Sequence, residues 1–134
     1  MLATDAMGGD QVRTSMRILL ADDDDIIRTV LGRLLERQGH SVRVVSNGQE
    51  AVDSAAANEY DLVLLDLRMP RMGGAEAARM LRQASVGGHR PRIVGISADA
   101  DSRTEAECAG MDDFLPKPVR LADLERVIWA HTAV

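Results

Sequence analysis

The sequence has few aromatic residues, one cysteine and no long apolar run, and each shortage excludes a class of protein. Aromatics make up 2% of the 134 residues, so the core must be built from aliphatic side chains and methionine. The single cysteine, Cys108, cannot form an internal disulfide, which fits a reducing compartment. No apolar run approaches the roughly 20 residues that span a bilayer, and the first residues lack a signal-peptide pattern. We therefore expect a soluble cytoplasmic protein with no membrane insertion.

Basic residues are also scarce relative to acidic ones. The chain has 16 lysine and arginine residues against 21 aspartate and glutamate residues, a formal net charge of −5. One run, Asp22 to Asp25, supplies four of these negative charges, and without it the net charge would be −1. Nucleic-acid binding needs clustered basic side chains, so we expect no nucleic-acid partner. The acidity is concentrated at one place in the sequence.

Short apolar segments alternate with helical patterns along the chain. Residues 1–16 are weakly patterned and are expected to form a flexible leader, and residues 17–132 are expected to form one domain. Strand-like segments occur at 18–21, 42–45, 62–65, 93–96 and 114–115, and helical patterns follow at 26–38, 49–58, 73–83, 102–109 and 121–128. This alternation predicts an α/β fold in which helices cover both faces of a doubly wound, five-stranded parallel sheet.

Polar side chains stand where these strands end. Asp22 and Asp23 follow the first strand, Asp66 the third, Ser97 the fourth, and Lys117 the fifth. Ligands of open parallel sheets bind beyond the carboxyl ends of the strands, so we expect these five side chains to converge.

The chemistry of these side chains favours a magnesium-dependent phosphoryl site. Crowded carboxylates repel one another unless a cation joins them, and Mg²⁺ takes oxygen ligands together with phosphate oxygens. The acidic run lacks the spacing of a calcium-binding EF-hand loop, and no histidine or cysteine spacing indicates zinc. An aspartate in such a site is a candidate nucleophile that forms an acyl phosphate.

Four segments, at 18–25, 66–74, 96–98 and 110–118, resemble in order and spacing the receiver domain of two-component response regulators. The resemblance covers about residues 17–131. It implies a flavodoxin-like sheet with strand order 2-1-3-4-5 and five helices. It also implies that Asp66 is the phosphoacceptor, that Asp23, Asp66 and the backbone carbonyl of Arg68 bind Mg²⁺, and that Asp22 assists through a metal-bound water.

The resemblance also implies roles for the later segments. Ser97 and Lys117 would each contact a phosphoryl oxygen, and Lys117 would pair with Asp66 before phosphorylation. Phe114 matches an aromatic residue whose side-chain rotamer follows the movement of Ser97. The Lys117–Pro118 bond matches a bond that is usually cis in this family.

The implied partners are a histidine kinase or a histidine phosphotransfer protein, and a downstream protein that binds the face of the fourth helix, fifth strand and fifth helix. We expect a single-domain regulator or phosphorelay receiver that catalyses only its own phosphorylation and dephosphorylation. The receiver portion of a hybrid histidine kinase is an alternative. An aspartyl phosphatase is a weaker one, because Arg68 stands where the haloacid dehalogenase type carries a second aspartate. The intact set of polar residues disfavours a receiver that works without phosphorylation.

Overall fold

The five strands form one parallel sheet. The computed structural model describes residues 15–83, 90–99 and 102–132, so residues 1–14 of the expected leader, 1–16, lie outside them. The strands are β2 (Arg17–Ala21), β3 (Ser41–Val45), β4 (Leu62–Asp66), β5 (Arg92–Ser97) and β6 (Asp113–Pro116). Their spatial order is β3-β2-β4-β5-β6, and every neighbouring pair is parallel. In chain order this is 2-1-3-4-5, which confirms the predicted fold.

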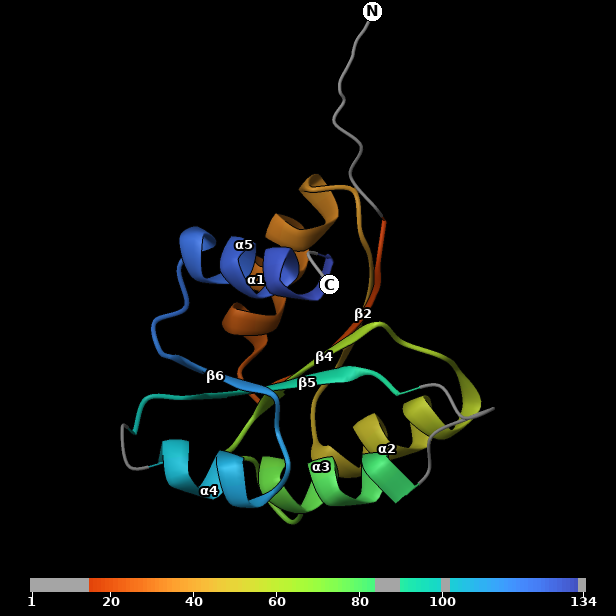
Figure 1. Cartoon of the computed structure of the whole chain (residues 1–134), viewed down its shortest axis with the longest axis vertical. Coiled ribbons are helices and arrows are strands. Elements are labelled where there is room, and N and C mark those ends of the chain that lie inside the picture. The colour runs from red at the N-terminus through yellow and green to blue at the C-terminus, as the bar shows by residue number, and fades with distance from the viewer. Residues whose placement is uncertain (1–14, 84–89, 100–101, 133–134) are drawn as a thin grey trace, which may run out of the picture.

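Five helices cover the two faces of the sheet (Figure 1). They are α1 (Asp25–Arg37), α2 (Gly48–Ala57), α3 (Gly74–Gln83), α4 (Ser102–Cys108) and α5 (Leu121–Thr132). Helices α1 and α5 lie on one face, and α2, α3 and α4 lie on the other. This is the arrangement that right-handed crossovers produce when the chain begins near the middle of a parallel sheet and reverses direction once.

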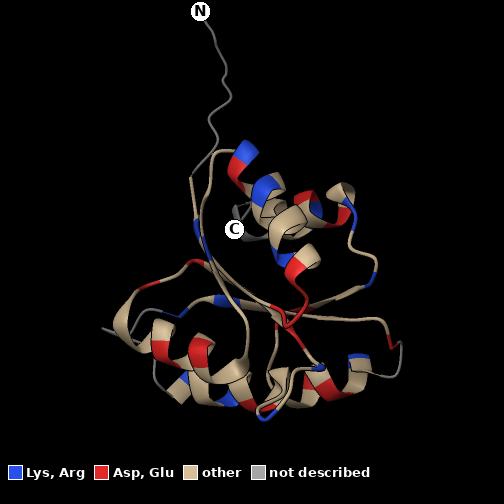
Figure 2. Ribbon diagram, turned by 180° about the vertical axis from the view of Figure 1, so that it is seen from behind, with Lys and Arg blue, Asp and Glu red and all other residues tan. Residues whose placement is uncertain are grey.

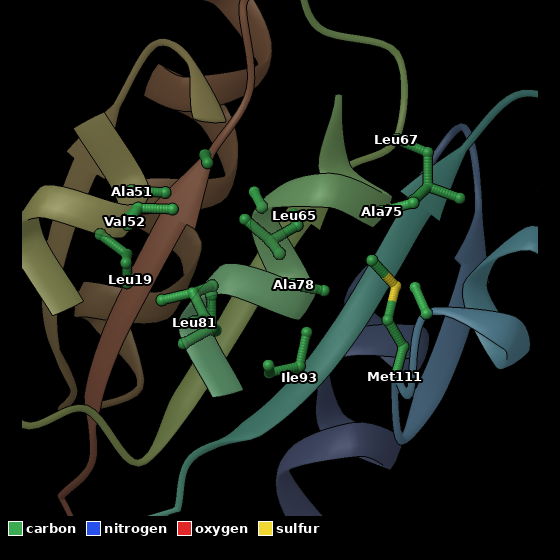
Figure 3. Packing of buried hydrophobic residues seen from close by; sticks show 14 of the residues in the cluster. Leu19, Ala51, Val52, Leu65, Leu67, Ala75, Ala78, Leu81, Ile93 and Met111 are labelled. Atoms are coloured by element: carbon green, nitrogen blue, oxygen red, sulfur yellow. The ribbon is translucent and has the colours of Figure 1, made fainter. Parts of the chain in front are cut away.

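The central strands are apolar along their whole length because both of their faces are covered. All five residues of β4 are buried, as are four of five in β2 and five of six in β5. The side chains alternate between two clusters. Leu19 and Leu65 pack toward α2 and α3 (Figure 3), and Val63 belongs to the same cluster. Leu20 and Leu64 pack toward α1 and α5. The edge strand β3 is largely exposed.

The packed structure begins one residue before the first strand. Met16, which we expected in the leader, is buried, and its backbone N–H donates to Nδ1 of buried His40 at 3.1 Å. Its side chain belongs to the cluster beneath α1 and α5.

Some apolar residues of helix α1 are not buried in the core. Leu31 and Leu35 are buried, but Ile26 is 73% exposed and Val30 is 50% exposed. Ile26 and Val30 are four residues apart and so share a helix face beside the one that packs on the sheet. Helix α1 therefore has two apolar faces, one packed on the sheet and one exposed to solvent.

Candidate functional site

Four strand ends bring the predicted polar residues to one edge of the sheet. Asp22 and Asp23 follow β2, Asp66 ends β4, Ser97 ends β5 and Lys117 follows β6. These four strands are consecutive neighbours in the sheet, with Ser97 in register with Pro116. Figure 2 shows acidic residues along the short segment that leads from β2 into α1. The predicted convergence is thus present in the structure.

Lys117 holds two buried carboxylates together. Its Nζ lies 3.2 Å from Oδ2 of Asp22 and 3.3 Å from Oδ2 of Asp66. Both aspartates are almost completely buried, whereas Lys117 is partly exposed. Lys117 is also the sole lysine of the sequence. Two negative charges therefore face one positive charge at this edge of the sheet.

The three carboxylates fit a hard divalent cation. Asp22, Asp23 and Asp66 can each offer one carboxylate oxygen, and these oxygens all lie within 4.8 Å of one another. Oδ2 of Asp22 is buried and, apart from its ion pair with Lys117, has no hydrogen-bond partner among the described residues. A buried carboxylate oxygen of this kind needs further positive charge, and oxygen ligands are those that Mg²⁺ prefers.

Burial and neighbouring charges shift the two key pKa values. Desolvation raises the pKa of Asp66 to about 6. The hydrogen bond from the Arg68 backbone N–H opposes this increase, and the negative charge of Asp22 adds to it. Desolvation acts to lower the pKa of Lys117, but the charges of Asp66 and Asp22 outweigh it, so this pKa lies above its usual range. At neutral pH, Asp66 is mostly ionised and Lys117 is charged.

The acidic run divides into two pairs with different roles. Asp24 is the N-cap of α1, and its side chain accepts hydrogen bonds from the backbone N–H groups of Ile26 and Ile27 at 2.8 and 3.3 Å. Asp25 opens the helix and pairs with Arg28. Asp24 and Asp25 therefore serve the start of the helix. Asp22 and Asp23 are left to face the site.

Arg28 fixes the backbone of Asp22. Its Nη1 donates to the Asp22 carbonyl oxygen at 2.6 Å, while Asp22 Oδ1 accepts from the Asp24 N–H at 2.9 Å. These contacts hold the segment between β2 and α1 in one conformation. The sequence gives no signal for the contact of Arg28, because arginine is common on the polar face of any helix.

The start of α3 lies directly against Asp66. A Cβ atom on Gly74 would stand 2.5 Å from the Asp66 carbonyl oxygen, so the close approach requires glycine. On the other side, the backbone N–H of Arg68 donates to Asp66 Oδ1 at 3.1 Å. The carboxylate is therefore held by Arg68 at one oxygen and by Lys117 at the other.

Ser97 is at the site, but its hydroxyl bonds to α4. Ser97 Oγ donates to Ser102 Oγ at 3.2 Å and accepts from the Asp99 N–H at 3.1 Å. Ser102 is the buried first residue of α4 and also accepts from Arg68 Nη2 at 3.1 Å. The sequence did not predict this role for Ser102, because a serine at a helix start normally indicates only a cap.

Phe114 and Pro118 lie beside these residues. Phe114 is buried in the cluster beneath α2, α3 and α4, and the Arg103 guanidinium lies 5.1 Å from the centre of its ring. The Lys117–Pro118 bond is cis, as the resemblance implied.

An apolar groove adjoins the site. It has a volume of about 450 Å³. Its walls include Ile26, Ile27 and Val30 of α1, and Lys117 and Val119 after β6. Since Lys117 borders both features, the groove lies next to the residue that pairs with the carboxylates.

Comparison with known proteins gives one consistent family. Residues 18–128 match the family model described as "Response regulator receiver domain". A 113-residue segment, 82% of the chain, is 42% identical to 16% of the sensory/regulatory protein RpfC of Xanthomonas campestris. A 110-residue segment, 81% of the chain, is 44% identical to 47% of the response regulator MprA of a Mycobacterium species. The chain therefore spans less than half the length of these relatives.

Solved structures agree with the sequence matches. One similar structure is the receiver domain of the sensor histidine kinase PA1611 of Pseudomonas aeruginosa, which has magnesium in its active-site cleft. Its alignment with this chain has a TM-score of 0.81 and 32% sequence identity, and covers 90% of this chain and all of the PA1611 domain. Another is the receiver domain of Saccharomyces cerevisiae Ssk1, solved in complex with the histidine phosphotransfer protein Ypd1. This alignment has a TM-score of 0.80 and 28% sequence identity, and covers 89% of this chain and 90% of the Ssk1 chain.

Proposed function

The chain belongs to the response regulator receiver domain family, and from this premise we propose that Asp66 accepts a phosphoryl group from a phosphohistidine of a partner protein. The observation that carries the proposal is the placement of Asp66 between Lys117 and two further aspartates at the carboxyl edge of the sheet. A nucleophilic carboxylate, a fixed cation and a cluster of oxygen ligands are the parts that phosphoryl transfer requires.

The transfer replaces a P–N bond by a P–O bond. One carboxylate oxygen of Asp66 attacks phosphorus, and the bond between phosphorus and the histidine nitrogen breaks. The imidazole leaves with the bonding electron pair and takes up a proton from solvent, and Asp66 becomes an acyl phosphate. The Lys117 ammonium, 3.3 Å from Asp66 Oδ2, is placed to balance the negative charge that the phosphoryl oxygens bring. Hydrolysis by water later returns the carboxylate.

The residues that would hold Mg²⁺ are Asp23, Asp66 and the backbone carbonyl of Arg68, with Asp22 acting through a metal-bound water. When bound, the ion supplies positive charge to the phosphoryl oxygens. The clustered carboxylate oxygens and the magnesium ion in the related PA1611 domain support this assignment. Ser97 would donate to a phosphoryl oxygen, and a change in the Phe114 rotamer would follow.

The phosphoryl donor is a histidine kinase or a histidine phosphotransfer protein that docks in the apolar groove. Ile26 and Val30 are large, apolar and exposed, and the groove that they line reaches Lys117. A helix that carries the phosphohistidine could bury these side chains while its imidazole faces Asp66. The complex of the related Ssk1 domain with Ypd1 supports a partner of this class.

Output would pass through the face formed by α4, β6 and α5. Helix α5 carries exposed Leu121 and Trp129, and Trp side chains are frequent anchors of protein interfaces. None of the described helices is both long enough and apolar enough to cross a bilayer. We place the protein in the cytoplasm, where the phosphohistidine donors act, and propose no nucleic-acid contact.

Two settings are open to the domain. A single-domain regulator or phosphorelay receiver is the first, and the receiver portion of a hybrid histidine kinase is the second. The likeness to the receiver domain of the sensor histidine kinase PA1611 favours the hybrid setting, and the match to MprA favours a response regulator. The family membership gives no support to an aspartyl phosphatase.

Incubation with Mg²⁺ and acetyl phosphate, followed by intact mass measurement, tests the proposal. We expect a single phosphoryl adduct that survives acid, is lost in base and is absent from Asp66→Asn. Asparagine preserves the shape of the side chain but is a much weaker nucleophile. If neither acetyl phosphate nor a phosphorylated histidine phosphotransfer protein gives an adduct, the proposed function is wrong.

A further inference from the structure

Arg68 connects the phosphoacceptor to α4 through two different parts of the residue. Its backbone N–H donates to Asp66 Oδ1, whereas its guanidinium donates to Ser102 Oγ at 3.1 Å and pairs with Glu105 at 3.1 Å. Asp99 lies 3.6 Å from the same guanidinium. Arg68 therefore clamps the first turn of α4 to the segment that follows β4.

Ser102 joins this clamp to Ser97. Its hydroxyl oxygen accepts hydrogen bonds from both Ser97 Oγ and Arg68 Nη2, and both serine side chains are buried. A hydroxyl group has one proton to donate. If Ser97 donates that proton to a phosphoryl oxygen on Asp66, it must stop donating it to Ser102.

Apart from these contacts and that of Arg103 with the Phe114 ring, helix α4 buries little side-chain area. It contains seven residues, of which Ser102 and Ala106 are buried. A buried alanine contributes little apolar area, so the polar contacts at the first turn carry an unusual share of the stability of this helix.

We propose that Arg68, Ser102 and Glu105 form a latch, here called the α4 latch, that holds α4 in place until the Ser97 hydroxyl turns to a phosphoryl group on Asp66. The proposal rests on the proposed phosphorylation of Asp66. Phosphorylation ends the donation of the Ser97 proton to Ser102 and offers new anionic oxygens to the Arg68 guanidinium, which then leaves Glu105. The first turn of α4 loosens as a result.

The contacts of the α4 latch stabilise only the unphosphorylated state, so they make phosphorylation less favourable. Weakening it shifts the population toward the state that binds a phosphoryl group, and the affinity for that group must rise by the same factor. Exposed ion pairs contribute roughly 0.2–1 kcal/mol, so removal of the Glu105 charge predicts an increase of about one and a half to fivefold.

The test compares Glu105→Gln with Glu107→Gln in the full chain. Both substitutions remove one negative charge from α4, but the Glu107 side chain makes no hydrogen bond or ion pair with any described residue. Beryllofluoride with Mg²⁺ serves as the phosphoryl mimic. Its dissociation constant and the amide hydrogen exchange of residues 102–108 are measured for each variant, and Ser102→Ala is a second variant that interrupts the latch at its other end.

We expect Glu105→Gln and Ser102→Ala to bind beryllofluoride more tightly and to exchange α4 amides faster before binding, whereas Glu107→Gln matches the wild type. Bound wild-type protein should show the fast α4 exchange of the variants. If the wild type binds beryllofluoride, but α4 exchange and affinity are the same in Glu105→Gln and Glu107→Gln, the latch is wrong and the proposed function stands. Failure of the wild type to bind beryllofluoride, together with the absence of an adduct from both acetyl phosphate and a phosphorylated histidine phosphotransfer protein, would overturn both.

Discussion

The ammonium nitrogen of Lys117 lies 3.3 Å from Oδ2 of Asp66, although 51 residues separate the two in the sequence. The same nitrogen lies 3.2 Å from Asp22, so one cation faces two buried carboxylates. Burial, to which the charge of Asp22 adds, raises the pKa of Asp66, and the excess of carboxylates makes this edge of the sheet fit a divalent cation. The paired charges also make the electrostatics of the site accessible to direct measurement.

The first prediction concerns the pKa of Lys117. Because the charges of Asp66 and Asp22 favour the ammonium form over the opposing effect of burial, Lys117 should titrate above the ordinary range of lysine. Protein labelled with ¹³C at lysine Cε should give one resonance, since the sequence has a single lysine. Asp66→Asn removes one charge and should lower the pKa. A lysine resonance with an ordinary pKa that Asp66→Asn leaves unmoved would contradict the pairing.

The second prediction concerns stability and pH in the absence of Mg²⁺. The folded-state pKa of Asp66, about 6, lies above its ordinary value of 3.8, so ionisation costs more in the folded protein. The stability that Asp66 contributes is therefore complete below pH 3.8 and is lost as pH rises through 6. Relative to the wild type, Asp66→Asn should gain about 1–3 kcal/mol between pH 4 and pH 7.5, at roughly 1.4 kcal/mol per pKa unit.

Urea unfolding of the wild type and Asp66→Asn across this pH range measures the difference. Added Mg²⁺ should narrow it at pH 7.5, because a cation that binds the folded carboxylates stabilises the wild type. Glu76→Gln, an exposed acidic residue of α3, is the control and should show no comparable pH-dependent gain. A pH-independent difference between wild type and Asp66→Asn would show that Asp66 is not destabilised by its burial.

The third prediction concerns Gly74. A Cβ at this position would stand 2.5 Å from the Asp66 carbonyl oxygen, so Gly74→Ala must displace either α3 or the strand end that carries the phosphoacceptor. Overpacking of this kind costs about 1–3 kcal/mol, and it should also slow phosphorylation by acetyl phosphate. Gly73→Ala meets its nearest atom at 3.2 Å and should have the smaller effect on both. Equal unfolding midpoints for the two variants would contradict the close approach.

The sheet and its polar edge could be predicted because they depend on local patterns. Continuous apolar runs such as that of β4 form strands buried on both faces, and an acidic residue after each run lies at the carboxyl edge whatever the details of packing. The pattern makes Asp66 a candidate nucleophile, and its proposed role as the phosphoacceptor comes from the resemblance to receiver domains. The strands and their convergent polar ends are accordingly present in the structure as predicted, whereas the strand order, which the structure confirms, was implied by the family resemblance.

The remaining features depend on contacts between side chains that are distant in sequence. Whether Ile26 packs inward or faces solvent depends on how α1 is rotated on the sheet. The apolar residues of α1 cover more than one face of the helix, so their pattern does not determine this rotation. Ser102 receives hydrogen bonds from Ser97 and Arg68 because α4 happens to begin beside the end of β4. Polar residues at a helix start have many uses, and the sequence does not distinguish among them.

The last prediction separates docking of the donor from the chemistry of Asp66. Ile26→Ser and Val30→Ser remove apolar area from the groove that leads to Lys117, and both side chains are at least half exposed, so stability should change by less than about 0.5 kcal/mol. Transfer from a phosphorylated histidine phosphotransfer protein should fall by roughly tenfold, because each apolar side chain buried in an interface contributes about 1.5 kcal/mol. Phosphorylation by acetyl phosphate, which needs no docking surface, should be unchanged.

Thr29→Ala is the matched control, because Thr29 is exposed on the same helix but does not line the groove. Initial rates with the two donors give the comparison directly. Equal losses with both donors would mean that the substitutions disturb Asp66 through α1, since the segment that joins this helix to β2 carries Asp22 and Asp23. Unchanged rates with both donors would place the docking surface elsewhere. A loss confined to the protein donor assigns the exposed face of α1 to recognition, and leaves the buried face to hold the carboxylates in position.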